Sequence, residues 1–372
     1  MPLVASVDLV IFMKVAAITP RVKNSLRVID VPGPEPRGGE VLVDVVRAGI
    51  CGTDEELNAG VVGEAPEGSD LLIIGHENLG RVAAVAGDVR CHREGDLVVA
   101  TVRRPCPERC FECRNYRQDM CLTGDYLERG IKGMHGYMAG QYVERVENLV
   151  PIPPRLEKVA VLLEPLSIVE KGIRAAFTIQ ERLPWEPDRA LVAGAGPIGL
   201  LAAFVLRDMG LETYAFATRD AESLKARVAE ASGARYVNVK ETPMDRIVAD
   251  HGPFDIVVEA TGQSQIAFDA IRLVDKNGVV CLTGLSPHQG THSVCTDCVN
   301  MDLVLNNKVV FGTVSANRLH FERALDRMAA IERKWPGLLE RMFTRRVDLD
   351  HVVEGMRRSS DDIKVVVEIG HR

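Results

Sequence analysis

The stretch Ala190–Gly199, ALVAGAGPIG, places three glycines directly after an apolar strand and at the mouth of a helix. This G-x-G-x-x-G spacing allows a tight turn, a close approach of the backbone to a pyrophosphate, and close packing of helix against strand. The first turn of the helix adds free N–H groups that attract phosphate. The alternative is a glycine-rich structural turn, but the setting between strand and helix favours dinucleotide binding. The predicted contacts are Gly194, Gly196, Pro197, Ile198 and Gly199.

The sequence around this turn alternates strands with helices. Strands are predicted at Ala190–Ala193, Glu212–Ala217 and Phe254–Glu259, with helices at Pro197–Met209 and Gln265–Val274. Such alternation is typical of a parallel sheet that is covered by helices on both faces. The predicted fold class is therefore α/β, with a doubly wound parallel-sheet domain of the Rossmann type.

The end of the second strand bears on the choice of coenzyme. An acidic residue at this point would hold the ribose 2′-hydroxyl of NAD, but Ala215–Ala217 and Thr218 offer none. Arg219 could fork onto a 2′-phosphate, while Asp220 fits the N-cap of the next helix. A solvated surface arginine is the alternative. The pattern favours NADP bound through Thr218 and Arg219, with NAD also open.

The first third of the chain is rich in strands. Glu40–Ile50 alternates apolar and polar residues, as a half-buried strand does, and short strands are also predicted at Asn78–Ala86 and Asp96–Thr101. Regular turn signals at this spacing predict a barrel-like antiparallel domain.

Length, composition and charge limit the classes of function. The 372 residues are 46% hydrophobic and 26% charged, an ordinary globular mix for two domains. A net charge of −7 and 5% aromatic residues argue against a nucleic-acid partner. No apolar run reaches the roughly 20 residues that cross a bilayer, so no membrane partner is expected. Residues 1–12 lack the basic start of a signal peptide. We expect Met13 to be the natural start, with a short extra strand as the alternative.

Four of the nine cysteines form a close cluster with the spacing C-x3-C-x2-C-x7-C. Without a secretion signal, such a cluster predicts metal ligands rather than disulfides, in a reducing, cytoplasmic compartment. Four thiolates suit a closed structural zinc site, and an iron–sulfur centre is the less favoured alternative. The predicted ligands are Cys106, Cys110, Cys113 and Cys121. A later pair, Cys295 and Cys298, is expected to be ordinary thiols in a loop near the cofactor.

A second candidate metal site combines residues that lie far apart in the chain. Cys51 lies in GICGTD, just after a strand, and His76 and Glu77 lie in GHE. Each alone could be a buried core residue, but together, beside glycines at strand ends, they favour zinc. A catalytic zinc needs three protein ligands and an open position. Glu164, in EPLS, is the candidate third ligand.

These motifs, in this order, resemble the zinc-dependent medium-chain alcohol dehydrogenase superfamily, from about Lys14 to the C-terminus. Within it, the chain looks most like the archaeal glucose dehydrogenases. The segments that carry this second likeness are Arg103–Pro105, Arg117–Asp119, Glu128–Ile131, His135–Gly136, Glu164–Lys171 and Gly312–Asn317.

The resemblance implies a GroES-like catalytic domain over residues 1–176, with its structural zinc lobe at 103–125. A Rossmann domain would cover 177–313, and residues 314–372 would complete the catalytic domain. A homotetramer with two zinc ions per chain is also implied.

The resemblance also assigns roles to single residues. Cys51, His76 and Glu164 would bind the catalytic zinc, and Glu77 would lie behind them or exchange with a ligand. Asn317 would lie on the nicotinamide side of the coenzyme site. The implied catalytic residues are Cys51, Thr53, His76 and Glu77. The implied substrate contacts are Thr53, Glu128 and Glu164.

The implied reaction is zinc-dependent oxidation of an aldose, first of all glucose, to its lactone. Zinc would lower the pKa of the hydroxyl, hydride would pass to NAD(P), and Thr53 with water would carry the proton outward. Two departures from the family pattern are the x3 spacing after Cys106 and Leu305, near a position where some relatives carry a histidine. Alternative substrates are another polyol, an alcohol or a threonine-like compound. A non-catalytic NADP-binding homologue is disfavoured by the presence of Cys51 and His76.

Overall fold

The computed structural model describes residues 12–242, 244–286 and 290–370. Expectations for the chain before Phe12 lie outside the described residues. The chain forms two compact units. The first runs to Val161 and takes up Arg345–Arg358 and the chain from Val365, while the second is Leu162–Thr344 with Ser359–Lys364.

The first unit is built around one long strand, β3 (Glu40–Ile50), whose alternating pattern buries every second side chain in its first half. It pairs antiparallel with β5 (Glu77–Val85), β10 (Gln141–Arg145) and β19 (Lys364–Glu368). The order of the longest path is β11-β6-β5-β3-β19-β18. The remaining strands of this sheet are β6 (Leu97–Ala100), β11 (Leu149–Pro151) and β18 (Phe343–Asp348).

Two small three-stranded sheets flank the main sheet. One contains β1 (Phe12–Ile18), β2 (Arg27–Pro32) and β4 (Leu72–Ile73). The other contains β7 (Arg103–Arg104), β8 (Leu127–Arg129) and β9 (Gly133–Met134). The short helices of this unit are α1 (Gly52–Asn58), α2 (Phe111–Arg114) and α10 (Val352–Gly355). The main core joins the N-terminal and C-terminal parts of the unit, because Ile50, Ile74 and Val365 belong to one apolar cluster.

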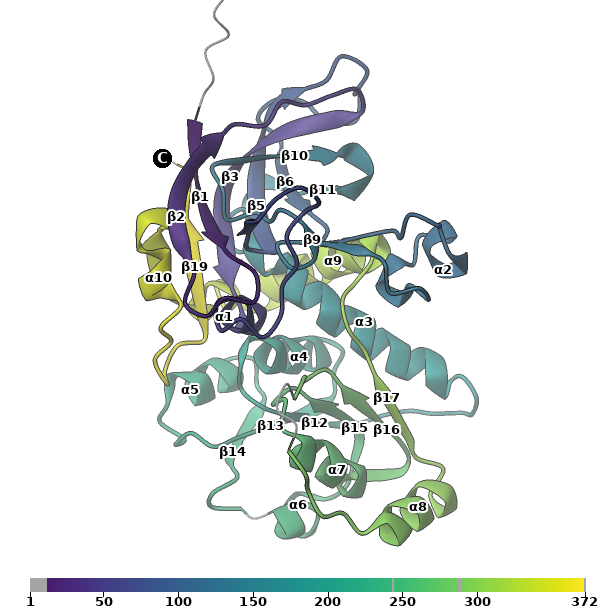
Figure 1. Cartoon of the computed structure of the whole chain (residues 1–372). Coiled ribbons are helices and arrows are strands. Elements are labelled where there is room, and N and C mark those ends of the chain that lie inside the picture. Colours follow the sequence, from purple (N-terminus) through teal and green to yellow (C-terminus); the bar gives the residue numbers. More distant parts are fainter. Residues whose placement is uncertain (1–11, 243, 287–289, 371–372) are drawn as a thin grey trace, which may run out of the picture. The chain divides into compact units, whose positions relative to one another are not determined.

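The second unit is a six-stranded parallel sheet in the order β14-β13-β12-β15-β16-β17. Helices α3, α4, α5 and α9 lie on one face, and α6 and α7 lie on the other (Figure 1). This is the α/β, doubly wound fold that the strand–helix alternation predicts. The strands are β12 (Arg189–Ala193), β13 (Glu212–Ala217), β14 (Arg235–Asn238), β15 (Phe254–Glu259), β16 (Val274–Leu282) and β17 (Val309–Gly312). The helices are α3 (Leu163–Gln180), α4 (Pro197–Asp208), α5 (Leu224–Glu230), α6 (Met244–His251), α7 (Ser264–Leu273) and α9 (Arg318–Lys334).

The division into compact units differs from the boundaries expected at residues 176 and 313. Helices α3 and α9 pack against each other and against α4, so both belong to the second unit. The sequence pattern marks both as amphipathic helices, but an apolar stripe does not say which neighbour will cover it.

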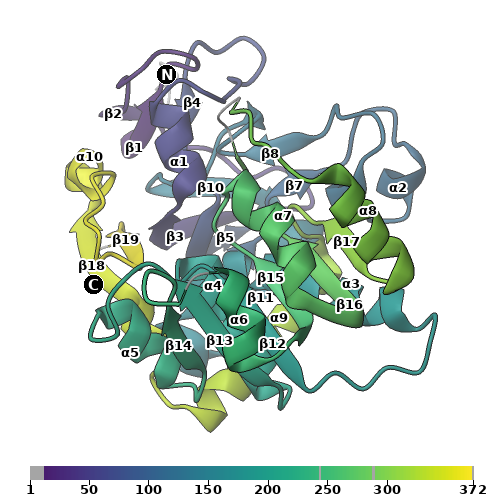
Figure 2. The same ribbon diagram turned by 90° about the horizontal axis from the view of Figure 1, so that it is seen from below.

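A further helix, α8 (Thr296–Leu305), lies beside α7 (Figure 2). It begins at the N-cap residue Cys295, which forms a disulfide with Cys298. The expectation of two ordinary thiols in a loop is therefore wrong, since the pair closes the first turn of a helix. No helix in the described part of the chain has the length and apolarity to span a membrane.

Candidate active site and metal centres

Two strand ends in the first unit bring Cys51 and His76 together. Strand β3 ends at Ile50, directly before Cys51, and β5 begins at Glu77, directly after His76. Because Gly49 lies opposite Glu77 in the antiparallel register, the two metal donors come to adjacent points of the sheet. Cys51 Sγ lies 2.9 Å from His76 Nε2.

A buried carboxylate supports this pair. Asp54, in the first turn of α1, accepts a hydrogen bond from the backbone N–H of Cys51 at 2.9 Å. Its other oxygen lies 3.8 Å from His76 Nδ1. A carboxylate behind a histidine fixes the orientation of the ring and leaves the opposite nitrogen for a metal. Burial raises the pKa of the Cys51 thiol, and the neighbouring His76 opposes that shift.

The donor atoms of Cys51, His76 and Glu77 all lie within 4.8 Å of one another. Sulfur, imidazole nitrogen and carboxylate oxygen are the ligands that zinc takes in catalytic sites, so the residues present fit this ion. Thr53 is half-buried in the first turn of α1, two residues after Cys51. Glu164 is buried in the first turn of α3, in the second unit, and its role as a ligand stays a prediction.

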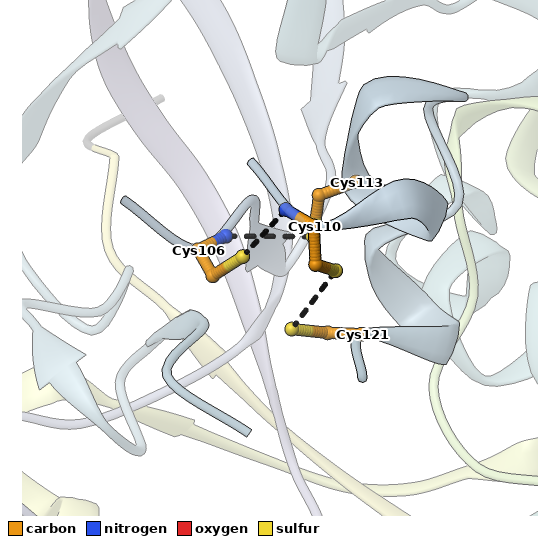
Figure 3. A group of neighbouring side chains, drawn as sticks. All are labelled: Cys106, Cys110, Cys113 and Cys121. Carbon is orange, nitrogen blue, oxygen red and sulfur yellow. Dashed lines mark hydrogen bonds between the residues drawn. The ribbon is translucent and has the colours of Figure 1, made fainter. Parts of the chain in front are cut away.

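The four-cysteine loop folds between β7 and β8 and contains α2. Its four sulfur atoms lie within 4.8 Å of one another, and Figure 3 shows the side chains converging. Cys106 takes part despite the x3 spacing. The Sγ atoms of Cys110 and Cys121 lie 3.9 Å apart. Four converging thiols on one short loop fit a closed tetrahedral zinc site.

Backbone N–H groups point at these sulfur atoms, as they do around bound thiolates. The N–H of Cys110 donates to Cys106 Sγ at 3.3 Å, and that of Leu122 donates to Cys110 Sγ at 3.4 Å. The bonds from the N–H groups of Leu122 and Cys113 lower the pKa of Cys110 to about 6. Burial raises the pKa of Cys113 to about 12, so the loop holds thiols of different acidity. Metal binding requires all four to lose their protons.

Glu128 lies in β8, at the base of this loop, and is not a solvated loop charge. It faces Arg103 across the β7–β8 pair, and an ion pair of 2.6 Å joins the two side chains. The turn after Glu128 packs against the metal-donor segment: a Cβ at Gly130 would lie 2.4 Å from the Gly75 carbonyl oxygen. Only glycine fits there, and its φ of +73° also favours glycine. The backbone therefore holds the turn that follows Glu128 against Gly75, the residue before His76.

The glycine-rich turn forms the floor of a cavity of about 340 Å³ in the second unit. Helix α4 begins at Pro197 after the N-cap Gly196. A Cβ at Gly199 would lie 1.9 Å from the Gly194 carbonyl oxygen, which explains the third glycine. The polar and glycine residues of the lining include Gly194, Gly196, Thr218, Arg219, Lys225, Thr261 and Gln263.

One basic residue that lines this cavity was not predicted from the sequence. Lys225 lies in α5 and lines the cavity together with Arg219, whose backbone carbonyl accepts a 2.9 Å bond from the Tyr236 hydroxyl. Ser223, not Asp220, is the N-cap of α5, because its hydroxyl accepts the N–H of Ala226. The later start of the helix places Lys225 in its first turn. The sequence signal that could have identified Lys225 is its position as a basic residue in the segment after the second strand.

Asn317 and Leu305 lie elsewhere in the second unit. Asn317 is buried and caps α9 by accepting the backbone N–H of His320, so its predicted contact with the nicotinamide stays a prediction. Leu305 is the last residue of α8 and is exposed.

Comparisons with known proteins match nearly all of the chain to dehydrogenases. Residues 157–369 match the family described as glucose dehydrogenase C-terminus, and residues 37–154 match the alcohol dehydrogenase GroES-like domain. A glucose 1-dehydrogenase of Methanocella arvoryzae is 69% identical over 96% of this chain and all of that protein. A glucose 1-dehydrogenase of Caldivirga maquilingensis is 44% identical over 96% of this chain and 99% of that protein.

Among solved structures, a glucose dehydrogenase of Haloferax mediterranei in complex with NADP, Zn and gluconolactone superposes with a TM-score of 0.89. It is 34% identical, and the match covers 97% of this chain and 100% of that one.

Proposed function

The chain belongs to the glucose dehydrogenase family of the zinc-dependent medium-chain alcohol dehydrogenases, and from this membership we propose that it oxidises an aldose, first of all glucose, to the lactone. It is an NAD(P)-dependent oxidoreductase, with NADP as the preferred coenzyme. The Haloferax relative holds NADP, zinc and gluconolactone together, which are the coenzyme, metal and product of that reaction.

The observation that carries the proposal is the 2.9 Å approach of Cys51 Sγ to His76 Nε2, with Asp54 behind the histidine. A chain that had lost catalysis would have no need to hold a thiol, an imidazole and a buried carboxylate at the ends of two paired strands. Cys51, His76 and Glu164 are the proposed ligands of the catalytic zinc, with Glu77 beside them.

When bound, zinc supplies Lewis acidity that lowers the pKa of a hydroxyl, and the coenzyme accepts a hydride. The chain's own residues do the rest. Thr53 stands two positions after Cys51 and is the proposed carrier of the hydroxyl proton toward water. Glu128 accepts a hydrogen bond from another hydroxyl of the sugar, which orients the ring. Glu164 is the third proposed substrate contact.

The proposed preference for NADP rests on two cations in the cavity of the second unit. Arg219 and Lys225 line it, and β13 ends at Ala217 without the acid that would hold a ribose 2′-hydroxyl. Guanidinium and ammonium groups both suit a 2′-phosphate. Gly194, Gly196, Pro197, Ile198 and Gly199 are proposed to bind the pyrophosphate at the start of α4, and Asn317 the nicotinamide side.

A second, structural zinc ion is proposed at Cys106, Cys110, Cys113 and Cys121. The convergence of four sulfur atoms supports it. The ion would replace a hydrophobic core, because the loop carries few buried apolar side chains besides the cysteines.

We propose a homotetramer in the cytoplasm. An assembly is supported by α8, of which no residue is buried and whose apolar Met301, Val304 and Leu305 are exposed by 59–71%, and by the sheet edge at β17. The cytoplasmic location is supported by the four converging cysteines of the loop, which are free thiols suited to a metal rather than disulfides. Light scattering of the purified protein tests the tetramer.

The proposed function is tested by coenzyme reduction across a panel of aldoses, polyols, threonine and simple alcohols. Preference for an aldose with NADP is the expected result. Preference for a polyol, an alcohol or threonine would replace the substrate while keeping the chemistry. No reduction with any of them would indicate a non-catalytic homologue.

A further inference from the structure

Arg103 and Glu128 form an ion pair at the base of the cysteine loop, and two nitrogens of Arg103 contact the same oxygen of the Glu128 carboxylate. Arg103 Nε donates to Glu128 Oε1 at 2.8 Å, and Arg103 Nη2 lies 2.6 Å from the same oxygen. Within the described residues, no hydrogen bond reaches the other carboxylate oxygen, Glu128 Oε2. The Glu128 side chain is 13% exposed, compared with 5% for Arg103, so the carboxylate is the less buried partner of the pair.

Arg103 itself is fixed from several sides. Its side chain is only 5% exposed, and its guanidinium carbon lies 3.7 Å from the centre of the Tyr126 ring. Its third nitrogen, Nη1, donates to the Asp119 carbonyl oxygen at 3.1 Å. An arginine that is stacked and hydrogen-bonded in this way loses little further freedom on holding a carboxylate.

The Asp119 carbonyl belongs to the cysteine loop, between Cys113 and Cys121 in the sequence. Arg103 therefore joins the loop to Glu128, in addition to the strand pairing of β7 with β8. A loop that folds around a metal would place the Asp119 carbonyl, which in turn fixes Arg103. The position of the Glu128 carboxylate then depends on the folded loop.

We propose that Arg103 is a positioning residue for the sugar: it occupies Oε1 of Glu128 and turns Oε2 toward one hydroxyl of the aldose. This proposal rests on the proposed function, because it assumes that Glu128 contacts a sugar. A lone carboxylate would rotate between several acceptor directions. A carboxylate with one oxygen fixed presents the other in a single direction, and a site of that kind discriminates strongly against an analogue that lacks the hydroxyl.

The alternative is that Arg103 only closes the base of the cysteine loop. The two roles differ in what they predict for substitutions. If Arg103 only closes the base of the loop, replacing it should lower the zinc content, the stability and the activity together, with every substrate. A positioning residue would change the KM for the sugar and leave the coenzyme and the metal content unchanged.

The test uses the full-length, zinc-loaded protein with the variants Arg103→Met and Arg103→Lys. We expect Arg103→Met to raise the KM for the aldose by about 10-fold or more, the loss that corresponds to a charge-assisted hydrogen bond. Arg103→Lys should raise the KM for the aldose less than Arg103→Met does, but still above that of the unchanged protein. An ammonium group cannot contact Glu128, Tyr126 and the Asp119 carbonyl at the same time. The KM for NADP and the zinc content should stay as in the unchanged protein.

Lys132→Met is the matched control. Lys132 Nζ also lies over the Tyr126 ring, at 5.0 Å, and donates to the Gly124 carbonyl oxygen, but it does not contact the Glu128 carboxylate. Its loss removes a cation from the same ring and should leave the KM for the aldose unchanged.

A series of monodeoxy sugars gives a second readout from the substrate side. With the unchanged protein, the sugar that lacks the hydroxyl bound by Oε2 should be penalised most. With Arg103→Met, that penalty should largely disappear, while the penalties for the other deoxy sugars remain. This comparison needs only a folded Arg103 variant, so it holds where Glu128→Ala would not fold.

Two results would overturn the inference: an unchanged KM for the aldose in Arg103→Met, or a loss of zinc that accounts for the whole effect in both variants. In either case the proposed function stands if the unchanged protein oxidises aldoses. If it oxidises none, the proposed function fails first and the role of Arg103 falls with it.

Discussion

Cys51 Sγ and His76 Nε2 lie 2.9 Å apart at the ends of two antiparallel strands, although 25 positions separate the residues in the chain. The register of β3 with β5 sets this approach, and the buried Asp54 carboxylate lies 3.8 Å from the other ring nitrogen of His76. The sheet that forms the core of the first unit therefore also assembles the metal-binding pair.

Replacing Cys51 with alanine should give a folded, inactive protein that has lost one of its two zinc equivalents. The side chain sits at a strand end and contributes little to the core, so its removal costs metal affinity rather than stability. Elemental analysis and activity measure the two effects. Cys91→Ala is the control, because Cys91 is exposed and belongs to neither metal group. A Cys51→Ala protein that kept both zinc equivalents would remove Cys51 from the ligand set.

Replacing Cys113 with alanine should destabilise the cysteine loop and lower the melting temperature or dissociate the assembly. Cys113 is buried, and the four sulfur atoms replace the apolar contacts that the loop lacks. Thermal unfolding with and without a chelator measures the effect. An unchanged melting temperature together with two zinc equivalents would contradict a structural metal at this site.

Replacing Arg219 with alanine should weaken NADP binding by about 10- to 150-fold and leave NAD almost unchanged, since one charge-assisted hydrogen bond contributes about 1.5–3 kcal/mol. Lys225→Ala should act in the same direction. Coenzyme titrations of both variants give the ratio. Equal losses for NADP and NAD would show that neither cation recognises the 2′-phosphate.

Replacing Glu144 with glutamine should destabilise the first unit by about 3 kcal/mol, the cost of breaking a buried charge cluster. Glu144 is buried and pairs with Arg104 and, at 2.9 Å, with Arg129. Burial alone would raise the pKa of this carboxyl, but the two guanidinium groups lower it to about 2.

The sign of the pH dependence follows from that lowered pKa. The ionised carboxylate stabilises the fold fully above its unfolded pKa, near 4.5, and this contribution is lost as the pH falls toward 2. Denaturant unfolding should therefore show that the difference in the free energy of unfolding between the unchanged protein and Glu144→Gln becomes smaller over that pH range. A difference that stayed constant would mean that Glu144 is not ionised in the fold.

Much of the fold could be predicted from the sequence because its signals are local. Strands β3, β13 and β15 have the predicted bounds, since alternation or an unbroken apolar run between turn residues marks them. Helix α8 could not be found in this way, because none of its residues is buried and it has no apolar stripe on a polar background. The Cys295–Cys298 disulfide within it was missed for the same reason.

The candidate site was predictable as residue types but not as an arrangement. Cys51 and His76, each next to a glycine, predicted a pair of metal ligands. In the sequence, Asp54 is an ordinary acidic residue in the first turn of a helix, and only the structure shows its carboxylate 3.8 Å from the ring of His76. The pairing of Arg103 with Glu128 depends on how two strands meet across the whole cysteine loop. Nothing local in the sequence encodes that register.

The most direct test of the account is the ratio of kcat/KM for glucose to that for a small alcohol such as cyclohexanol, measured with NADP in the unchanged protein and in Glu128→Ala. We expect a strong preference for the sugar. Glu128→Ala should lower kcat/KM for glucose by about 1.5–3 kcal/mol, the contribution of a charged hydrogen bond, and change the rate with the alcohol much less. An enzyme that oxidises cyclohexanol well, ignores every aldose and is indifferent to Glu128→Ala would contradict the account.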